Sequence, residues 1–184
     1  VEESNGEIRE GTLYCIACKS EFSVQNSIPR FVPPENYAHS FGFQWNKHAR
    51  TQIDKFSGIS MSRDRFFYVT KWNKNLNGQK ILEAGCGAGR FTQIALELDA
   101  DVFSFDYSNA VDANFANNGL KDNFHPFQAD IYHIPLQRGS FDKIFCFGVL
   151  QHCPDPKKSF ICLITFLRSG GEIAIDIYDL NFRA

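Results

Sequence analysis

The sequence predicts an α/β protein with an open, doubly wound and mostly parallel sheet. From residue 80 onward, short runs of β-branched and aromatic residues alternate with helical patterns, as expected for parallel strands buried on both faces. A glycine-rich turn joins the first strand of this series to its helix. At 184 residues, 43% hydrophobic and 22% charged, the chain fits one ordinary globular domain with a small addition.

The chain before this series is expected to begin with a short β ribbon. Extended pieces at residues 12–14, 21–24 and 28–31 surround Cys15 and Cys18, and a CxxC turn between strands is one knuckle of a zinc ribbon. One knuckle supplies only two of the four ligands of a structural zinc, so we expect no stoichiometric metal. Three interpretations stay open: half of a ribbon completed upstream, a vestige without metal, and a redox pair.

Two helices are expected between the ribbon and the sheet. A proline pair is followed by an aromatic, helix-prone stretch at residues 37–53. A second helix is expected from an N-cap at Ser60 or Ser62 through Trp72, ending at Asn77 and Gly78. Its apolar positions recur at helical spacing, so packing against the core is its default role.

Five strands and three helices are then expected to alternate. The strands are 81–84, 102–105, 124–129, 143–147 and 172–177, and the helices lie near 91–98, 109–118 and 156–167. Right-handed crossovers make such a series an open sheet, and ligands bind at the carboxyl ends of its strands.

The glycine-rich turn predicts a nucleotide-type ligand site. Gly85, Gly87 and Gly89 directly follow a buried strand and directly precede a helix. Glycine allows backbone conformations that a Cβ would forbid and lets a ligand approach the main chain closely, while the helix N-terminus directs N–H groups at the turn. An ordinary strand–helix loop is the alternative interpretation.

Acidic residues at three strand ends point to the same edge of the sheet. Glu83 is costly to bury unless it is paired, so it is expected to serve a cationic ligand group or to orient the glycine turn. Asp106 follows at about the 20-residue spacing at which dinucleotide folds hold a ribose diol. Asp130, followed by Ile131, suits the amino edge and the face of an adenine. An exposed acid that starts a helix is the alternative for Asp106.

Nicotinamide and adenosylmethionine proteins share this plan, and the details favour the second. The glycine fingerprint of dinucleotide-binding proteins requires a glycine at the position that Arg90 occupies here. Residues 83–89 form an acid-x-Gly-x-Gly-x-Gly pattern, and further motifs follow at 140–144, 147–156 and 167–172. In this order they resemble the class I S-adenosylmethionine-dependent methyltransferases of the small-molecule type. The part before them is similar to a bacterial subgroup with a zinc-ribbon-like segment ahead of the catalytic domain.

The resemblance implies a sheet of order 3-2-1-4-5 and S-adenosyl-L-methionine as the cofactor. The residues that it places at the methionine end are Glu83, Gly85, Gly87 and Gly89, and Cys86 within this turn is a further expected cofactor residue. The other cofactor residues that it implies are Asp106 at the ribose, the neighbouring Tyr107, Asp130 and Ile131 at the adenine, Phe147 and Gly148 near the sulfonium, and Trp45 in a covering lid. It divides the chain into a partial zinc-ribbon-like segment (1–36), a helical lid (37–78) and a methyltransferase core (79–184). This core would lack the last two strands of the family sheet.

Methyl transfer from a sulfonium mainly requires proximity, alignment and exclusion of water. A general base is needed only if the acceptor must lose a proton, and His152 is the first candidate, with His133 second. A histidine of the pocket wall is the alternative for His152. A binding module without turnover and an NAD-dependent oxidoreductase are the alternative functions.

The composition bears on partners and location. A net charge of −2 and the absence of a long Lys/Arg cluster lead us to expect a small-molecule acceptor and no nucleic acid. The longest apolar runs are too short to span a bilayer and no secretory segment opens the chain, so we expect a cytoplasmic protein without a membrane partner. The sequence predicts neither the acceptor nor the oligomeric state.

Overall fold

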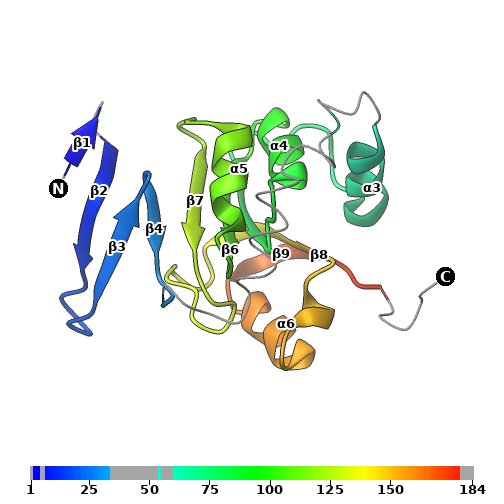
Figure 1. The fold of residues 1–184 in the computed structure, drawn as a ribbon. Coiled ribbons are helices and arrows are strands. Elements are labelled where there is room, and N and C mark those ends of the chain that lie inside the picture. The colour runs from blue at the N-terminus through cyan, green and yellow to red at the C-terminus, as the bar shows by residue number, and fades with distance from the viewer. Residues whose placement is uncertain (1, 5–6, 34–53, 55–59, 179–184) are drawn as a thin grey trace.

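The computed structural model describes residues 2–4, 7–33, 54 and 60–178. In this part of the chain nine strands form one sheet, in the order β1-β2-β3-β4-β7-β6-β5-β8-β9 (Figure 1). The strands are β1 (Glu2–Ser4), β2 (Glu7–Tyr14), β3 (Glu21–Gln25), β4 (Ile28–Arg30), β5 (Lys80–Ala84), β6 (Asp101–Asp106), β7 (Phe124–Gln128), β8 (Phe141–Phe147) and β9 (Leu167–Asp176). The α-helices are α3 (Met61–Thr70), α4 (Arg90–Glu97), α5 (Ala110–Asn118) and α6 (Pro156–Ile164), and a 3₁₀ turn spans Leu150–His152.

The five strands from β5 onward are parallel and lie in the order that the resemblance implies. Ala84 of β5 lies opposite Phe105 of β6, and Asp106 lies opposite Gln128 of β7. The carboxyl ends of these strands therefore meet at one edge, where parallel sheets hold their ligands.

The sheet is larger than predicted because the N-terminal ribbon is part of it. Strands β2, β3 and β4 form an antiparallel meander, and β4 pairs in parallel with β7 at Arg30 and Gln128. The Phe31 amide also donates to the Gln128 carbonyl at 2.8 Å. Without the meander β7 would be an open edge with unpaired backbone groups. The expected separate ribbon is thus an extension of the core sheet.

Helices α3, α4 and α5 cover one face of the sheet and α6 covers the other (Figure 1). The first layer is anchored by Phe66 of α3, whose ring packs edge-on against Phe145 and Phe147 of β8 at centroid distances of 5.5 and 6.2 Å. Full burial of such a side chain stabilises a fold by about 1.5–3 kcal/mol. This packing fixes α3 beside the carboxyl ends of the strands.

The ends of α3 differ from the expectation. Ser60 is the N-cap residue, but its hydroxyl donates to Asp64 at 2.8 Å and does not cap the helix. The Asp54 carboxylate instead accepts from the Ser62 and Arg63 amides at 3.0 and 2.9 Å. Lys71, in the left-handed conformation, ends the helix before Trp72. The expected helix at 37–53 and its Trp45 lie outside the described residues.

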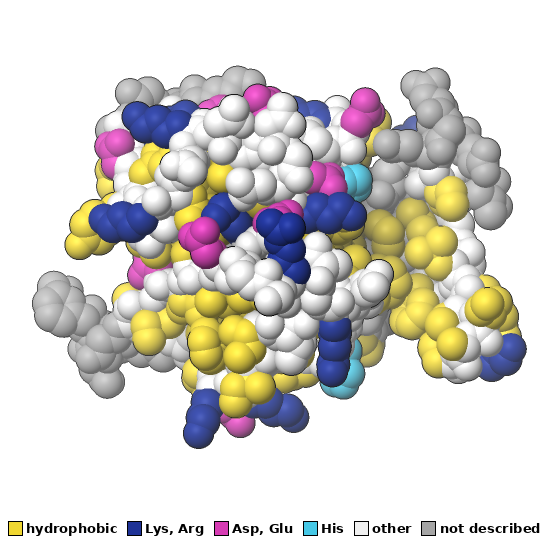
Figure 2. All heavy atoms as spheres, turned by 180° about the vertical axis from the view of Figure 1, so that it is seen from behind, with side chains coloured by type: hydrophobic (Ala, Val, Ile, Leu, Met, Phe, Trp, Pro, Cys, Tyr) yellow, Lys and Arg dark blue, Asp and Glu magenta, His cyan; other side chains and the backbone are white. Residues whose placement is uncertain are grey.

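The surface carries both signs of charge. Figure 2 shows one face of the molecule, on which basic and acidic side chains are interspersed rather than gathered into separate areas. None of the helices in the described part of the chain combines the length and apolarity needed to cross a membrane.

Candidate functional site

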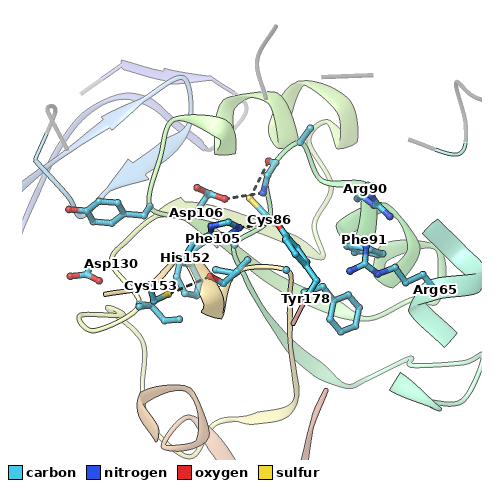
Figure 3. Close-up of a pocket in the computed structure, with 18 residues that line it drawn as sticks. Arg65, Cys86, Arg90, Phe91, Phe105, Asp106, Asp130, His152, Cys153 and Tyr178 are labelled. Carbon is cyan, nitrogen blue, oxygen red and sulfur yellow. Dashed lines mark hydrogen bonds between the residues drawn. The ribbon is translucent and has the colours of Figure 1, made fainter. Parts of the chain in front are cut away.

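A cavity of about 380 Å³ opens at the carboxyl ends of β5, β6, β7 and β8 (Figure 3). This volume lies within the ~300–1,000 Å³ that small-molecule and cofactor sites usually have. The lining residues are Arg65, Gly85, Cys86, Gly87, Ala88, Arg90, Phe91, Phe105, Asp106, Tyr107, Asp130, Ile131, Phe147, Gly148, Val149, His152, Cys153 and Tyr178. The fold thus gathers most of the residues predicted for the cofactor into one place.

The glycine turn forms the floor of this cavity. Gly85 has φ +78°, and a Cβ there would collide with the side chain of Val149. The Gly85 amide donates to the Phe105 carbonyl at 2.8 Å, which holds the turn against the end of β6. The turn therefore needs glycine both for its backbone conformation and for the space that Val149 occupies.

Asp106 holds the glycine turn and one wall of the cavity together. Its carboxylate accepts from the Gly87 amide at 3.0 Å and from the amide and hydroxyl of Ser108 at 2.9 and 2.7 Å. Burial raises the pKa of Asp106, although these hydrogen bonds favour its charged form. Tyr107 follows it in the wall.

Asp130 lies beyond Asp106, after the end of β7 (Figure 3). Its carboxylate accepts from the Tyr132 amide at 3.0 Å and lies 3.0 Å from the His133 ring. Ile131 lines the cavity beside it and is buried. A carboxylate next to an apolar surface is therefore present, as the sequence predicts.

Two guanidinium groups lie at the opposite end of the cavity (Figure 3). Arg65 of α3 forms a 2.5 Å ion pair with Asp176. Arg90 lies over the Phe91 ring at 4.5 Å. Arg65 was not predicted as a site residue, and Arg90 was expected only to rule against a dinucleotide fingerprint. The place of Arg65 depends on how α3 packs on the sheet, and Arg90 is the first residue of α4, directly after the glycine turn.

His152 and Tyr178 stand together at the cavity (Figure 3). The His152 Nε2 atom and the Tyr178 hydroxyl are 2.9 Å apart. Tyr178 is 52% exposed, so the pair is open to solvent as well as to the cavity. Tyr178 was not predicted, because it follows the last strand without any motif. A cysteine, Cys153, completes this wall.

The structure places Glu83 and Gly89 outside the lining of the cavity. The Glu83 side chain is 2% exposed and accepts hydrogen bonds from the hydroxyls of Thr92 and, at 2.6 Å, Ser104. The Asn114 amide donates to both hydroxyls, at 3.0 and 2.9 Å. Glu83 is therefore paired within a buried network below the glycine turn, and Gly89 is the N-cap of α4.

Burial raises the pKa of Glu83 to about 7, although the Ser104 and Thr92 hydroxyls oppose the shift. The folded state consequently binds more protons than the unfolded state between about pH 4.5 and 7. The free energy of unfolding then falls as pH rises through this interval. The stabilisation from the protonated Glu83 is fully present below about pH 4.5 and is lost as the pH rises through about 7.

We expect Glu83→Gln to remove this pH dependence. The free energy of unfolding of Glu83→Gln minus that of wild type should increase by about 3 kcal/mol between about pH 4.5 and pH 7.5. Urea unfolding at several pH values measures the difference. Glu97→Gln is the matched control, since Glu97 forms an exposed ion pair with Arg63. Parallel curves for Glu83→Gln and wild type would contradict the assignment.

Cys15 and Cys18 lie at the turn between β2 and β3 as free thiols. The Cys15 amide donates to the Ser20 carbonyl at 2.9 Å, and hydrogen bonds with Ser20 lower the pKa of the Cys18 thiol. Among the described residues no group of three or more potential metal ligands is gathered at one place. The half-site interpretation therefore stays a prediction.

Known proteins are similar to the part of the chain that forms the parallel strands and the cavity. The family described as methyltransferase domain matches residues 82–175, which is half of the chain. The tRNA U34 carboxymethyltransferase of Nautilia profundicola is 34% identical over 114 residues, covering 58% of this chain and 38% of that protein. The ubiquinone biosynthesis O-methyltransferase of Paraburkholderia phymatum is 28% identical over 121 residues, covering 62% and 52%. The chain thus spans about half or less of these relatives' length.

Solved structures share the fold. A putative S-adenosyl-L-methionine-dependent methyltransferase from Methanococcus maripaludis matches with a TM-score of 0.60 and 19% identity, over 78% of this chain and 65% of that one. The Haemonchus contortus phosphoethanolamine N-methyltransferase 1, solved with phosphoethanolamine and S-adenosylhomocysteine, matches with a TM-score of 0.58 and 20% identity, over 74% and 31%. At these identities the likeness concerns the fold.

Proposed function

Because the chain belongs to the methyltransferase domain family, with the class I S-adenosyl-L-methionine-dependent fold, we propose that its cavity binds this cofactor and serves transfer of its methyl group. The observation that carries the proposal is the division of charge along the cavity. Asp106 and Asp130 lie at one end, and Arg65 and Arg90 lie at the other (Figure 3). S-adenosylmethionine has hydrogen-bond donors on its ribose and adenine, and a carboxylate on its methionine part.

The residues present fit this cofactor. Asp106 would accept hydrogen bonds from the ribose diol, and Asp130 with Ile131 would receive the amino edge and face of the adenine. Arg65 and Arg90 would hold the methionine carboxylate, and Gly85 allows the backbone to approach the ligand. The bound cofactor supplies an electrophilic methyl group on a sulfonium.

The chain's own part in the reaction is alignment and control of a proton. Phe147 and Gly148 at the end of β8 would wall off the reacting centre, with Phe147 packed edge-on against Phe91 at 5.0 Å. Such a wall excludes water and fixes the approach of the acceptor. His152, beside Tyr178, would take the proton from an acceptor that must lose one.

The expected exclusion of nucleic acid as a partner is wrong. Relatives that are 34% and 31% identical are named tRNA U34 carboxymethyltransferases. Net charge is a sum over the whole chain, so it does not report the charge of the surface that a substrate contacts. We therefore take tRNA as the acceptor class for this chain, on the strength of those relatives.

Two measurements test the proposal. In calorimetric titrations of the whole chain, S-adenosylhomocysteine should bind and NADH should not, since no glycine stands at Arg90. Radioactive methyl groups from S-adenosylmethionine should then appear in a tRNA pool. Binding of NADH alone would contradict the cofactor assignment. Labelling of a phenolic quinone precursor, with none of tRNA, would contradict the acceptor class.

A further inference from the structure

The N-terminal meander, β2 to β4, is linked through hydrogen bonds to the segment that carries Asp106 and Tyr107 of the cavity. Asp106 is the last residue of β6, and Tyr107 begins the loop of residues 107–109 that connects β6 to α5. β4 lies beside β7, next to β6 in the sheet (Figure 1). The meander therefore adjoins the wall on which the ribose and adenine would lie.

Arg30 of β4 is hydrogen-bonded to α5, which follows this loop, and to β7, which lies beside β6. Its Nη2 and Nη1 atoms donate to the Asp112 carboxylate at 2.6 and 3.1 Å, a two-pronged pair with the first turn of α5. Nη1 also donates to the Gln128 side-chain oxygen at 3.3 Å. Gln128 in turn donates from its Nε2 to the Tyr107 carbonyl at 2.9 Å. One guanidinium thus restrains both the loop and the helix that follows it.

The surroundings of Arg30 hold its guanidinium group in one position. The Arg30 side chain is 8% exposed, and bidentate charge-assisted pairs are the strongest and most directional hydrogen bonds of proteins. Ile28, two residues earlier on the same face of β4, is fully buried in one cluster with Val111 of α5 and Cys86 of the glycine turn. The meander thus also packs beneath the floor of the cavity.

We propose that the meander pre-organises the adenosine half of the cofactor site and that Arg30 is its positioning residue. This inference rests on the proposed function. Arg30 does not line the cavity, so it acts through Gln128, Tyr107 and α5 rather than by touching the cofactor. Holding a site in its bound geometry lowers the ordering cost of binding. The segment expected to be a remnant is then a working part of the site.

The test compares Arg30→Gln with Arg9→Gln, an arginine on the exposed side of β2. Calorimetry measures the affinity of each whole-chain variant for S-adenosylhomocysteine and for adenosine, well below its melting temperature. We expect Arg30→Gln to weaken both ligands by the same factor, roughly threefold to tenfold. Arg30→Lys should recover part of the loss, and Arg9→Gln should match wild type. A purely structural role would lower the melting temperature without changing affinity.

Gln128→Leu provides a second, independent variant, because it cuts the link to Tyr107 and leaves the Arg30–Asp112 pair in place. It should weaken both ligands by a similar factor. The double variant should lose less than the product of the two single factors, since both substitutions break the link from Arg30 through Gln128 to Tyr107. Unchanged affinity in Arg30→Gln or, if that variant does not fold, in Gln128→Leu would overturn the inference. Failure of wild type to bind S-adenosylhomocysteine would overturn the proposed function and this inference together.

Discussion

Asp106→Ala is expected to reduce the affinity for S-adenosylhomocysteine by about a hundredfold or more. The carboxylate would lose two charge-assisted hydrogen bonds to the ribose diol, each contributing roughly 1.5–3 kcal/mol. At about 1.4 kcal/mol for each tenfold change, even the lower figure reaches two orders of magnitude. The variant also loses the hydrogen bond that ties the Gly87 amide to β6. Calorimetric titration of wild type and variant measures the loss.

Asp101→Ala is the matched control, because it removes an acid from the opposite end of the same strand. Asp101 lies 2.7 Å from the His125 ring and does not line the cavity. The affinity of the Asp101→Ala variant for S-adenosylhomocysteine should equal that of wild type. An Asp106→Ala variant that binds within threefold of wild type would show that the ribose is held elsewhere.

The core of the fold could be predicted because its signals are local. Buried parallel strands read as continuous apolar runs, and β5 to β8 were expected within two residues of their observed bounds. The family match confirms the expected class of methyltransferase. β9 was expected to begin at residue 172 but begins at Leu167, which pairs with Phe141 before a shift in register. Gly170 and Gly171 within this stretch resemble a strand breaker.

The rest of the site could not be predicted, because it depends on contacts between distant segments. No local pattern shows that Arg30 will meet Gln128, 98 positions later. Arg65 reaches the cavity because its neighbour Phe66 fixes the rotation of α3 on the sheet. Glu83 was expected to serve a cationic ligand group or to orient the glycine turn, and its hydrogen-bond partners are Thr92 and Ser104 below that turn. A sequence shows which side chains need partners, and only packing decides which partners they find.

The pair formed by His152 and Tyr178 is expected to govern turnover rather than cofactor binding. If His152 takes the acceptor's proton, His152→Ala should lower turnover on the acceptor by about a hundredfold or more, the usual contribution of a positioned general base. The affinity for S-adenosylhomocysteine should stay within about twofold, because the cofactor's anchoring groups lie elsewhere in the cavity. Tyr178→Phe, which removes the hydroxyl 2.9 Å from Nε2, should cause a smaller loss by freeing the ring to reorient.

Single-turnover transfer to tRNA, measured beside the binding titration, separates the two effects. His125→Ala is the control, since His125 pairs with Asp101 at the far end of β6 and leaves the cavity untouched. Near-normal turnover of His152→Ala would reduce His152 to a residue of the cavity wall. Transfer would then depend on alignment alone, as expected for an acceptor whose attacking atom carries no proton to lose. The response of this one residue therefore reports on the chemistry of the acceptor as well as on the enzyme.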